Sequence, residues 1–365
     1  MSEWQTFCLK DLGKIIGGAT PPTNNPKNYG NKISWITPKD LSTLQGHYIK
    51  KGSRSISRLG FKSCSCVLLP KHAILFSSRA PIGYVAIAEK RLCTNQGFKS
   101  IIPNKKIYFE FLYYLLKYHK DNISNIGGGT TFKEVSGATL GLFKVKIPPT
   151  YHEQQKIART LSVLDQKIEN NHKINELLHN LTHKVYGYYF KYKPKNAKLE
   201  QIIIENPKSS IMVKNAQKTQ DKYPFFTSGD NTLSYPKAII DGRNCFLNTG
   251  GNAGIKFYVG KASYSTDTWC IYANEFSDYL YLLLSSIKTH INQSFFQGTS
   301  LKHLQKNLLK KYPIYMPSAH EIKKFNQIIM PLLTLISINT RTSKKLEQIR
   351  DFLLPLLLKQ QVKPQ

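Results

Sequence analysis

The sequence predicts an α+β protein in which one architecture is built twice: two similar mixed α/β globular domains, separated and joined by two long helices. We expect the helices to pack as an antiparallel coiled coil with internal pseudo-two-fold symmetry. The pattern Pro-x-x-His-Glu-x-x-Lys occurs at 149–156 and again at 317–324. Each copy follows a short β-type run and opens a long series of apolar residues at helical spacing. A repeat this long exceeds a solenoid period, so it indicates duplication of a whole domain with its helix.

The repeat divides the 365-residue chain into four segments. We assign residues 1–150 and 196–317 to the two globular domains. Residues 151–195 are assigned to a central helix and residues 318–365 to a distal helix. Each globular segment is long enough to bury a hydrophobic core of its own.

The first domain begins with a short mixed segment at 4–12 and a loop at 17–26, where Gly, Pro and Asn exclude regular structure. Long ordered loops often carry function. Helical spacing of apolar residues predicts a helix at 110–119. Short β-type runs predict strands at 33–38, 66–69, 73–76, 84–88 and 145–147. The short connections between these runs favour a mostly antiparallel arrangement.

The second domain resembles the first in outline and ends on a predicted strand at 312–315. Its segment 250–254 corresponds to 78–83 of the first domain, its segment 265–268 to 93–96, and its segment 298–302 to 129–133. Similar frames with different loops suggest two recognition domains, each of which would read a different nucleic-acid sequence while presenting its loops in the same way.

Each long helix carries an apolar seam with an asparagine in its middle. The central seam turns polar at Asn171 and Asn175, and Asn339 takes the place of Asn171 in the second copy. A buried asparagine is costly unless paired and typically fixes register, so we expect Asn171 and Asn339 near the crossing of the helices. In the alternative, each helix packs only on its own globular domain. The apolar seam residues are Ile157, Leu161, Leu164, Ile168, Leu178, Leu181 and Val185, then Phe325, Ile329, Leu332, Ile336, Leu346, Ile349 and Leu353.

The distal helix contains Pro331, where the first copy has Val163. An interior proline removes a backbone hydrogen bond and clashes with the preceding turn, at a cost of about 3 kcal/mol. We therefore expect the distal helix to kink or break near 327–330.

The net charge of +30 is unusual and is spread over every segment. A distributed positive field on a folded protein favours a polyanionic partner. The alternative is a solvated basic surface without a specific role. The six cysteines form no CxxC pair, which favours reduced thiols and no zinc site. The polar, acidic N-terminus and the absence of a long apolar stretch predict a cytoplasmic protein with no membrane partner.

Motifs of nucleic-acid chemistry are missing. The [Asn/Asp]-Pro-Pro-[Tyr/Phe] motif of amino-methyltransferases, a glycine-rich adenosylmethionine loop and the phosphate-binding GxxxxGK[ST] motif are absent. The segment 127–131 could hold a phosphate through backbone amides or be a simple turn. His152 and His320 are interpreted as capping or packing residues. We therefore predict no catalytic residue and no metal ligand.

Residues suited to DNA are plentiful, because basic groups adjoin turn glycines and aromatic side chains. Arginine can read guanine bidentately, and asparagine or glutamine can read adenine. Any one of these residues could instead be a solvated surface group. The candidate DNA-binding residues are Thr20, Lys27, Lys39, Arg54, Arg79, Asn95, Gln96, Lys133, Ser228, Arg243, Asn252, Lys256 and Lys302.

These motifs together resemble the specificity subunits of Type I restriction–modification systems, over nearly the whole chain. GGATPPT at 17–23 and NKISWITPKDL at 31–41 resemble the opening of a target-recognition domain, and SRAPIG at 78–83 and TNQGF at 94–98 its middle motifs. IPP at 147–149, EQQKI at 153–157 and LDQKIENN at 164–171 are similar to the central spacer helix. The second copy departs from the pattern, since Asp165 becomes Leu333 and Pro331 intrudes.

The resemblance implies a non-catalytic subunit whose two target-recognition domains each read one half of a split target in double-stranded DNA. It also implies that the helices set the gap between the halves and dock methyltransferase (M) subunits, which recruit the restriction (R) subunit. S-adenosylmethionine, ATP and Mg would then be bound by the partner subunits, with no cofactor on this chain. Two alternatives remain: a single-chain DNA-modifying enzyme fragment, or a non-specific nucleic-acid-binding scaffold.

Overall fold

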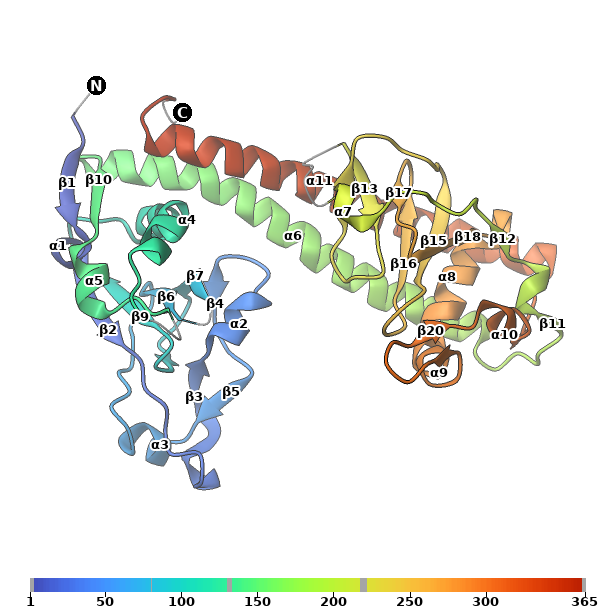
Figure 1. The fold of residues 1–365 in the computed structure, drawn as a ribbon, viewed down its shortest axis with the longest axis horizontal. Coiled ribbons are helices and arrows are strands. Elements are labelled where there is room, and N and C mark those ends of the chain that lie inside the picture. Colours follow the sequence, from blue (N-terminus) through green and yellow to red (C-terminus); the bar gives the residue numbers. More distant parts are fainter. Residues whose placement is uncertain (1–2, 80, 130–132, 217–221, 363–365) are drawn as a thin grey trace. The chain divides into compact units, whose positions relative to one another are not determined.

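The computed structural model describes residues 3–79, 81–129, 133–216 and 222–362 (Figure 1). The chain folds as two compact units. Unit 1 consists of Met1–Asn170 and Ser343–Gln365, and unit 2 of Asn171–Thr342. Both boundaries fall inside the long helices α6 (Tyr151–Phe190) and α11 (Ala319–Leu358). Each unit therefore contains a globular part and a segment of both helices.

Unit 1 is built around a five-stranded sheet with the order β2-β9-β6-β7-β4. All neighbours in this sheet are antiparallel except β4 and β7. A three-stranded sheet, β5-β3-β8, pairs β3 with β8 in parallel, and β1 pairs with β10. The mostly antiparallel prediction is confirmed. The strands are β1 (Gln5–Cys8), β2 (Gly13–Gly17), β3 (Tyr29–Ile36), β4 (Tyr48–Ile49), β5 (Arg54–Ile56), β6 (Ile74–Ser78), β7 (Ile82–Ala88), β8 (Cys93–Thr94), β9 (Lys99–Pro103) and β10 (Lys144–Ile147).

The core of unit 1 lies between this sheet, helix α4 (Phe109–Asn125) and the two long helices. Phe111, Leu112, Leu115 and Leu116 of α4 are buried there, as the helical spacing predicts. Leu161 of α6 and Leu354 of α11 close the same core, so the two helices run antiparallel within this unit. The short helices are α1 (Leu9–Leu12), α2 (Pro38–Ser42), α3 (Arg58–Lys62), α5 (Gly137–Leu142) and the 3-10 turn η1 (Pro26–Asn28).

Unit 2 repeats this plan. Its four-stranded sheet has the order β12-β18-β15-β16, and its three-stranded sheet, β14-β13-β17, again contains one parallel pair. β11 pairs with β21 as β1 pairs with β10. The duplication predicted from the repeated motif is confirmed by this shared topology. The strands are β11 (Ala197–Lys198), β12 (Ile204–Glu205), β13 (Tyr223–Phe226), β14 (Leu233–Tyr235), β15 (Arg243–Asn248), β16 (Ile255–Val259), β17 (Ser263–Tyr264), β18 (Thr268–Tyr272), β19 (Phe296–Gln297), β20 (His303–Leu304) and β21 (Pro313–Ile314).

Helix α8 (Ser277–Ser286) fills the core of unit 2, together with Phe190 of α6 and Phe325 of α11. The rings of Phe190 and Phe325 meet edge to face at 4.9 Å between centroids. The long helices are thus part of the domain core and also pack on each other, so the two packing alternatives coexist. The remaining short helices are α7 (Val213–Ala216), α9 (Lys288–Ser294), α10 (Lys306–Lys310), η2 (Leu199–Gln201) and η3 (Asn274–Phe276).

Both long helices begin at the repeated motif and share one capping device. In α11, the Ser318 amide donates to Glu321 Oε2 at 3.0 Å, and the Glu321 amide donates back to Ser318 Oγ at 3.3 Å. In α6, the Glu153 amide donates to Thr150 Oγ1 at 3.3 Å. This is the S/T-x-x-E capping pattern, which satisfies backbone donors that the first helical turn leaves open. The caps come from these side chains, while His152 and His320 are exposed.

Of the expected kink or break near 327–330, the break is wrong, because helix α11 runs continuously from Ala319 to Leu358. Pro331 removes the hydrogen bond to the carbonyl of Gln327, and both residues are exposed. Water can therefore satisfy that carbonyl.

Two further predictions are wrong. Residues 66–68 form no strand, and the expected seam residues Leu181 and Ile349 are exposed.

Candidate nucleic-acid interface

The glycine-rich loop at the start of unit 1 lies directly against the 94–98 turn. The Ala19 amide donates to the carbonyl of Thr94 at 3.0 Å. A Cβ on Gly18 would lie 2.0 Å from the Asn95 carbonyl oxygen, so only glycine allows this approach. Thr20 Oγ1 donates to Gln96 Oε1, which brings two predicted site residues together. A third, Asn95, uses its Oδ1 to accept from the Gly97 amide at 3.0 Å and so shapes the same turn.

A second group of predicted residues gathers where β6 ends. Arg79 forms an isolated antiparallel bridge with Glu134, next to the exposed Lys133. The Glu134 carboxylate lies 3.7 Å from Arg79 Nη1 and 3.2 Å from Lys99 Nζ. Sequence reasoning missed Glu134 and Lys99, because no local signal links them to Arg79. Ala80 of the SRAPIG motif and residues 130–132 of the glycine-rich segment lie outside the described residues.

The other basic candidates of unit 1 are exposed. Arg54 lines a surface hollow of about 410 Å³ together with Thr23, Pro26 and Tyr29. Lys27 lies beside it on η1, and Lys39 projects from α2. These cations are therefore accessible to a polyanion.

Asp40 fixes the turn that carries Arg54. Its carboxylate accepts hydrogen bonds from the amides of Thr37 and Ser53, both at 2.7 Å. Burial alone would raise the pKa of Asp40, but the hydrogen bonds from Ser53 and Thr37 outweigh it and lower the pKa below its usual value. An ionised Asp40 therefore holds this turn at neutral pH.

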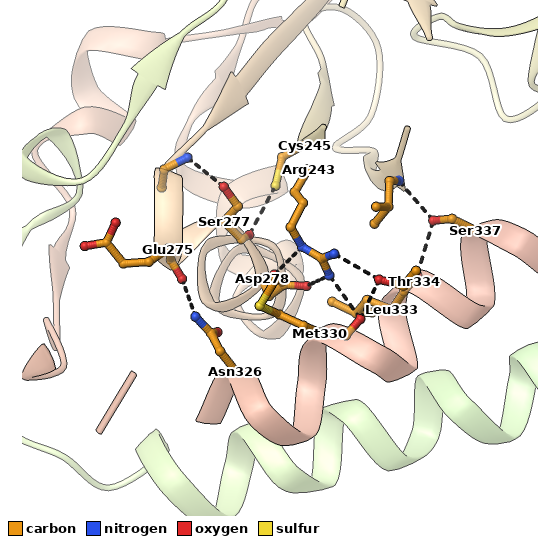
Figure 2. A network of polar contacts seen from close by, with 12 residues as sticks. Arg243, Cys245, Glu275, Ser277, Asp278, Asn326, Met330, Leu333, Thr334 and Ser337 are labelled. Carbon is orange, nitrogen blue, oxygen red and sulfur yellow. Dashed lines mark hydrogen bonds and ion pairs between the residues drawn. The ribbon is translucent and has the colours of Figure 1, made fainter. Parts of the chain in front are cut away.

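Arg243 of unit 2 is committed to contacts inside the protein (Figure 2). Its guanidinium forms a two-pronged ion pair with Asp278 of α8, with Nε donating to Asp278 Oδ2 at 2.6 Å. It also donates to Thr334 Oγ1 at 2.9 Å and to the Met330 carbonyl at 3.2 Å on α11. Burial raises the pKa of Asp278 although the Arg243 charge and hydrogen bond oppose this. Arg243 therefore joins β15, α8 and α11 and is not available to DNA.

Two other predicted residues of unit 2 also serve the fold. Lys256 Nζ donates to the carbonyls of Thr227 and Gly229, at 2.6 Å and 2.5 Å. Burial lowers the pKa of Lys256, in keeping with its half-buried position. Ser228 Oγ accepts from the Thr249 amide at 3.1 Å and donates to the Asp267 carbonyl. Lys256 and Ser228 thus shape the 227–230 turn.

Asn252 and Lys302 remain exposed on unit 2. Their segments meet where the Gly251 amide donates to the Lys302 carbonyl at 2.9 Å.

The hydrogen bonds here repeat those around Arg79. In unit 1, the Ser78 amide and hydroxyl both donate to the Gly97 carbonyl, and the Val135 amide donates to the Ser78 carbonyl. In unit 2, the Thr249 amide and hydroxyl both donate to the Asp267 carbonyl, and the Leu304 amide donates to the Thr249 carbonyl.

This shared pattern corrects one predicted correspondence. Gly97 matches Asp267, and β8 matches β17, so the segment 265–268 aligns two residues later than predicted, with 95–98. Short motifs without a strong repeat do not fix the alignment of loops, whereas the hydrogen bonds do.

An asparagine pair links the long helices in unit 2. Asn339 Nδ2 donates to Asn175 Oδ1 at 3.0 Å. Asn175 Nδ2 in turn donates to the Ile336 carbonyl at 3.3 Å and to Thr340 Oγ1 at 3.2 Å. Asn171 is buried. The partner of Asn339 is therefore Asn175, one helical turn beyond the aligned position.

A buried ion pair that sequence reasoning missed links the helices in unit 1. Arg350 Nη1 of α11 lies 2.6 Å from Asp165 Oδ1 of α6, and Tyr114 Oη of α4 donates to Asp165 Oδ2 at 2.6 Å. Burial alone would raise the pKa of Asp165, but the charges of Lys117 and Arg350 and the hydrogen bonds from Tyr114 and Arg350 lower it below its usual value. Asp165 is thus held ionised in the interior.

Apolar side chains remain exposed along the helices. In unit 2, Ile174, Leu177 and Leu181 follow each other at helical spacing on α6, and Leu177 is 68% exposed. In unit 1, Ile349 and Phe352 do the same on α11, and Phe352 is also 68% exposed. Leu181 and Ile349 occupy equivalent places in the two copies of the repeat. Neighbouring exposed apolar side chains of this kind are candidates for an interaction surface.

Among the described residues, no group of His, Cys, Asp or Glu could hold a metal ion. The six cysteines are all free thiols. In the part of the chain that the structure describes, no helix has the length and hydrophobicity to cross a bilayer.

Known proteins are similar to this chain in sequence. A family described as Type I restriction modification DNA specificity domain matches residues 1–180 and 194–348. Over 410 aligned residues the chain is 32% identical to the Type I restriction enzyme MjaIX specificity subunit of Methanocaldococcus jannaschii, an alignment that covers 98% of this chain and 93% of that protein. It is 31% identical over 177 residues to the Type I restriction enzyme HindI specificity subunit of Haemophilus influenzae, covering 46% and 37% of the two chains.

A crystal structure of the S subunit of a Type I restriction–modification system from M. genitalium has a similar fold. The TM-score is 0.68 at 18% sequence identity, over 98% of this chain and 96% of that one. The duplicated topology, the repeated loop frame and the sequence matches to both halves agree. The chain therefore belongs to the family of Type I restriction–modification specificity subunits.

Proposed function

We propose that this chain is the DNA sequence-recognition subunit of a Type I restriction–modification complex, and that it reads a bipartite target in double-stranded DNA with one half per globular unit. The observation that carries the proposal is the repeated loop frame, in which matching backbone hydrogen bonds present different side chains. Ser78 and Thr249 occupy equivalent places in this frame, while the half-exposed residues that follow them differ, Arg79 in unit 1 and Gly250 in unit 2. A constant frame with variable side chains suits two related surfaces that distinguish different bases.

The accessible polar residues support DNA as the partner. Lys27, Lys39, Arg54, Arg79 and Lys133 are exposed or half-exposed on unit 1, and Asn252 and Lys302 on unit 2. The net charge of +30 supplies a field that attracts phosphate. Phosphate contacts orient a protein on the duplex, whereas contacts to base edges discriminate between sequences. Both kinds of contact are needed, and the two surfaces offer lysines, arginines and amides.

The exposed apolar rows support docking of methyltransferase subunits through the helices. A row such as Ile174–Leu177–Leu181 is suited to an apolar helix face of a partner. The equivalent row on α11, with Ile349 and Phe352, offers a second such surface on unit 1. Two surfaces of the same kind fit two methyltransferase subunits, which would recruit the restriction subunit. We expect this complex to be cytoplasmic.

In this proposal the chain itself is not a catalyst. S-adenosylmethionine would be bound by the methyltransferase subunits, and ATP and Mg by the restriction subunit. The residues of this chain would bind the target, orient the complex on it and hold the partners.

The test is methylation by the purified complex. The chain should be produced with its methyltransferase partner, and the modified adenines mapped at base resolution on random DNA. We expect a single two-part motif with a constant gap, and no methyl transfer by the chain alone. Methyl transfer by the isolated chain would favour the single-chain enzyme instead, and methylation without sequence preference would favour the non-specific scaffold.

The docking surface has its own test. Leu177→Lys should prevent copurification with the methyltransferase while thermal unfolding of the isolated chain is unchanged. Glu176→Lys introduces the same side chain at the adjacent exposed position and serves as the matched control. Equal copurification of both variants would rule out docking through this row.

A further inference from the structure

An isolated antiparallel bridge joins Arg79 to Glu134 in unit 1, and another joins Gly250 to His303 in unit 2. The two bridges occupy equivalent positions in the repeated frame. Residue 79 follows Ser78, which holds the Gly97 carbonyl with its amide at 2.8 Å and its hydroxyl at 3.2 Å. Residue 250 follows Thr249, which holds the Asp267 carbonyl with its amide at 3.2 Å and its hydroxyl at 2.7 Å.

The backbone around both bridges is fixed. In unit 1, Ser78 is fully buried, and the Glu134 and Gly128 backbones exchange hydrogen bonds at 2.8 Å and 3.0 Å. In unit 2, the Leu304 amide donates to the Thr249 carbonyl at 3.0 Å, as Val135 donates to Ser78. A rigid backbone limits where the first exposed side chains can reach.

The side chains at the bridge differ completely between the units. Unit 1 places an arginine opposite a glutamate, and unit 2 places a glycine opposite a histidine. Replacement of both members on a conserved frame is the pattern expected where two domains distinguish different sequences.

The geometry of the pair does not fit a stability device. Arg79 and Glu134 are each 37% exposed and 3.7 Å apart, and an exposed, loose ion pair adds little stability. Lys99 is closer to the carboxylate, at 3.2 Å, and more buried, at 20% exposure. Lys99 therefore anchors Glu134, and the anchored carboxylate faces Arg79.

An anchored carboxylate changes what the arginine can bind. The guanidinium carries five donors, and a contact to Nη1 alone leaves others for a base edge. A DNA phosphate at Arg79 would bring a second negative charge next to Glu134, whereas the O6 and N7 acceptors of guanine are neutral. Like-charge repulsion of this kind discriminates against the wrong partner.

We propose that Glu134 is a positioning residue that directs Arg79 toward a guanine in the half-target of unit 1, so that the Arg79–Glu134 pair determines specificity there. The proposal rests on the proposed function, in that unit 1 must read one half of the target. Gly250–His303 is the equivalent position in unit 2.

The experiment uses the complex of the full chain with its methyltransferase. Methylation rates are measured on a duplex series in which each base of the two half-targets is replaced in turn. Glu134→Gln should reduce the preference for guanine at one position of one half-target by about 10-fold, the scale of a bidentate base contact. Methylation of the substituted duplexes should be kept or raised, because a carboxylate that repels phosphate is gone. The other half-target should be unaffected.

A double-variant cycle separates positioning from a general structural role. In an Arg79→Ala background, Glu134→Gln should have no further effect on base preference, since there is no arginine left to position. Arg79→Lys keeps a cation beside Glu134 but loses the fork, and should lose the guanine preference as well. It also tests the pair if Glu134→Gln does not fold. His303→Gln is the matched control and should alter only the half-target of unit 2.

Two results would overturn the proposal. One is an unchanged preference at every position in Glu134→Gln and Arg79→Lys. The other is an effect of Glu134→Gln that persists in the Arg79→Ala background or weakens methylation of all duplexes alike. Failure of the proposed function is distinguishable, because the unaltered complex would then show no two-part preference at all.

Discussion

The buried ion pair between α6 and α11 in unit 1 allows a quantitative prediction. Arg350 and Asp165 are 14% and 7% exposed and 2.6 Å apart, and Tyr114 donates to the second carboxylate oxygen. Arg350→Met removes the strongest partner of a carboxylate that the interior cannot solvate. Breaking a buried pair in this way costs about 3–5 kcal/mol. Because Lys117 also lies close to Asp165, we expect the lower end of that range, about 3 kcal/mol.

This loss should be visible as a change in thermal unfolding. For a domain of this size, 1 kcal/mol corresponds to about 2–4 °C, so the unfolding midpoint of unit 1 should fall by roughly 6–12 °C. Lys345→Met replaces an exposed cation on the same helix and should leave the midpoint within about 2 °C, since surface substitutions change stability by about 0.5 kcal/mol or less.

A double variant tests the physical reason. Asp165→Asn removes the charge but keeps an acceptor for Tyr114, so Asp165→Asn combined with Arg350→Met should recover at least half of the lost stability. Differential scanning calorimetry and urea unfolding, followed on all four proteins, measure the cycle. If Arg350→Met costs less than about 1 kcal/mol, or if the two substitutions simply add, the carboxylate is not dependent on its partner and the reasoning fails.

Three further predictions concern pH, backbone conformation and helix register. Because its pKa is lowered in the fold, Asp165 contributes stability above the pKa of the unfolded carboxyl, about 3.9, and this contribution is lost as the pH falls through the folded pKa. The free energy of unfolding, measured with urea from pH 7 to 2, should therefore decline less steeply toward acid pH for Asp165→Asn. Gly298 has φ +142° and its Cβ would meet a backbone oxygen at 2.3 Å, so Gly298→Ala should destabilise unit 2 by more than about 1 kcal/mol, whereas Gly242→Ala, at φ +97° with open space, should cost less in the same calorimetric scan. Asn175→Leu with Asn339→Leu should keep the helix content by circular dichroism but loosen the register, seen as a variable gap between methylated half-targets; an unaltered gap would contradict the role of this pair.

The long helices and the duplication could be predicted because their signals extend over many residues. A spacing error at one position changes little in a helix of 40 residues. The Pro-x-x-His-Glu motif placed the start of both helices correctly, since it includes the residues that cap them. Ile157, Leu161 and Phe325 are buried as the seam predicts.

Features that depend on distant contacts could not be predicted from local patterns. The 66–69 run is apolar enough for a strand, yet only Leu69 pairs, through a single bridge to Leu92. The exposure of Leu181 and Ile349 follows from which side of each helix faces the domain core. Periodicity alone does not distinguish that side from a face suited to a partner.

Distant contacts also decide which candidate DNA-binding residues are exposed and which are bound within the protein. Arg243 and Lys256 adjoin turns and aromatic residues like the others, but their cationic groups are bound within unit 2. Nothing near Arg243 in the sequence indicates that Asp278 or Thr334 will lie beside it. Conversely, the sequence does not single out Glu134, because a carboxylate is not a typical DNA-binding residue and its position opposite Arg79 depends on the fold.

The proposed function depends most on modular recognition, in which each globular unit would read its own half of one target. Exchange of residues 1–150 for the corresponding domain of another family member, followed by base-resolution mapping of adenines methylated by the reassembled complex, tests this directly. We predict a new motif in which one half has changed, while the other half and the gap between them are preserved. A change in both halves, or an unchanged motif, would contradict it.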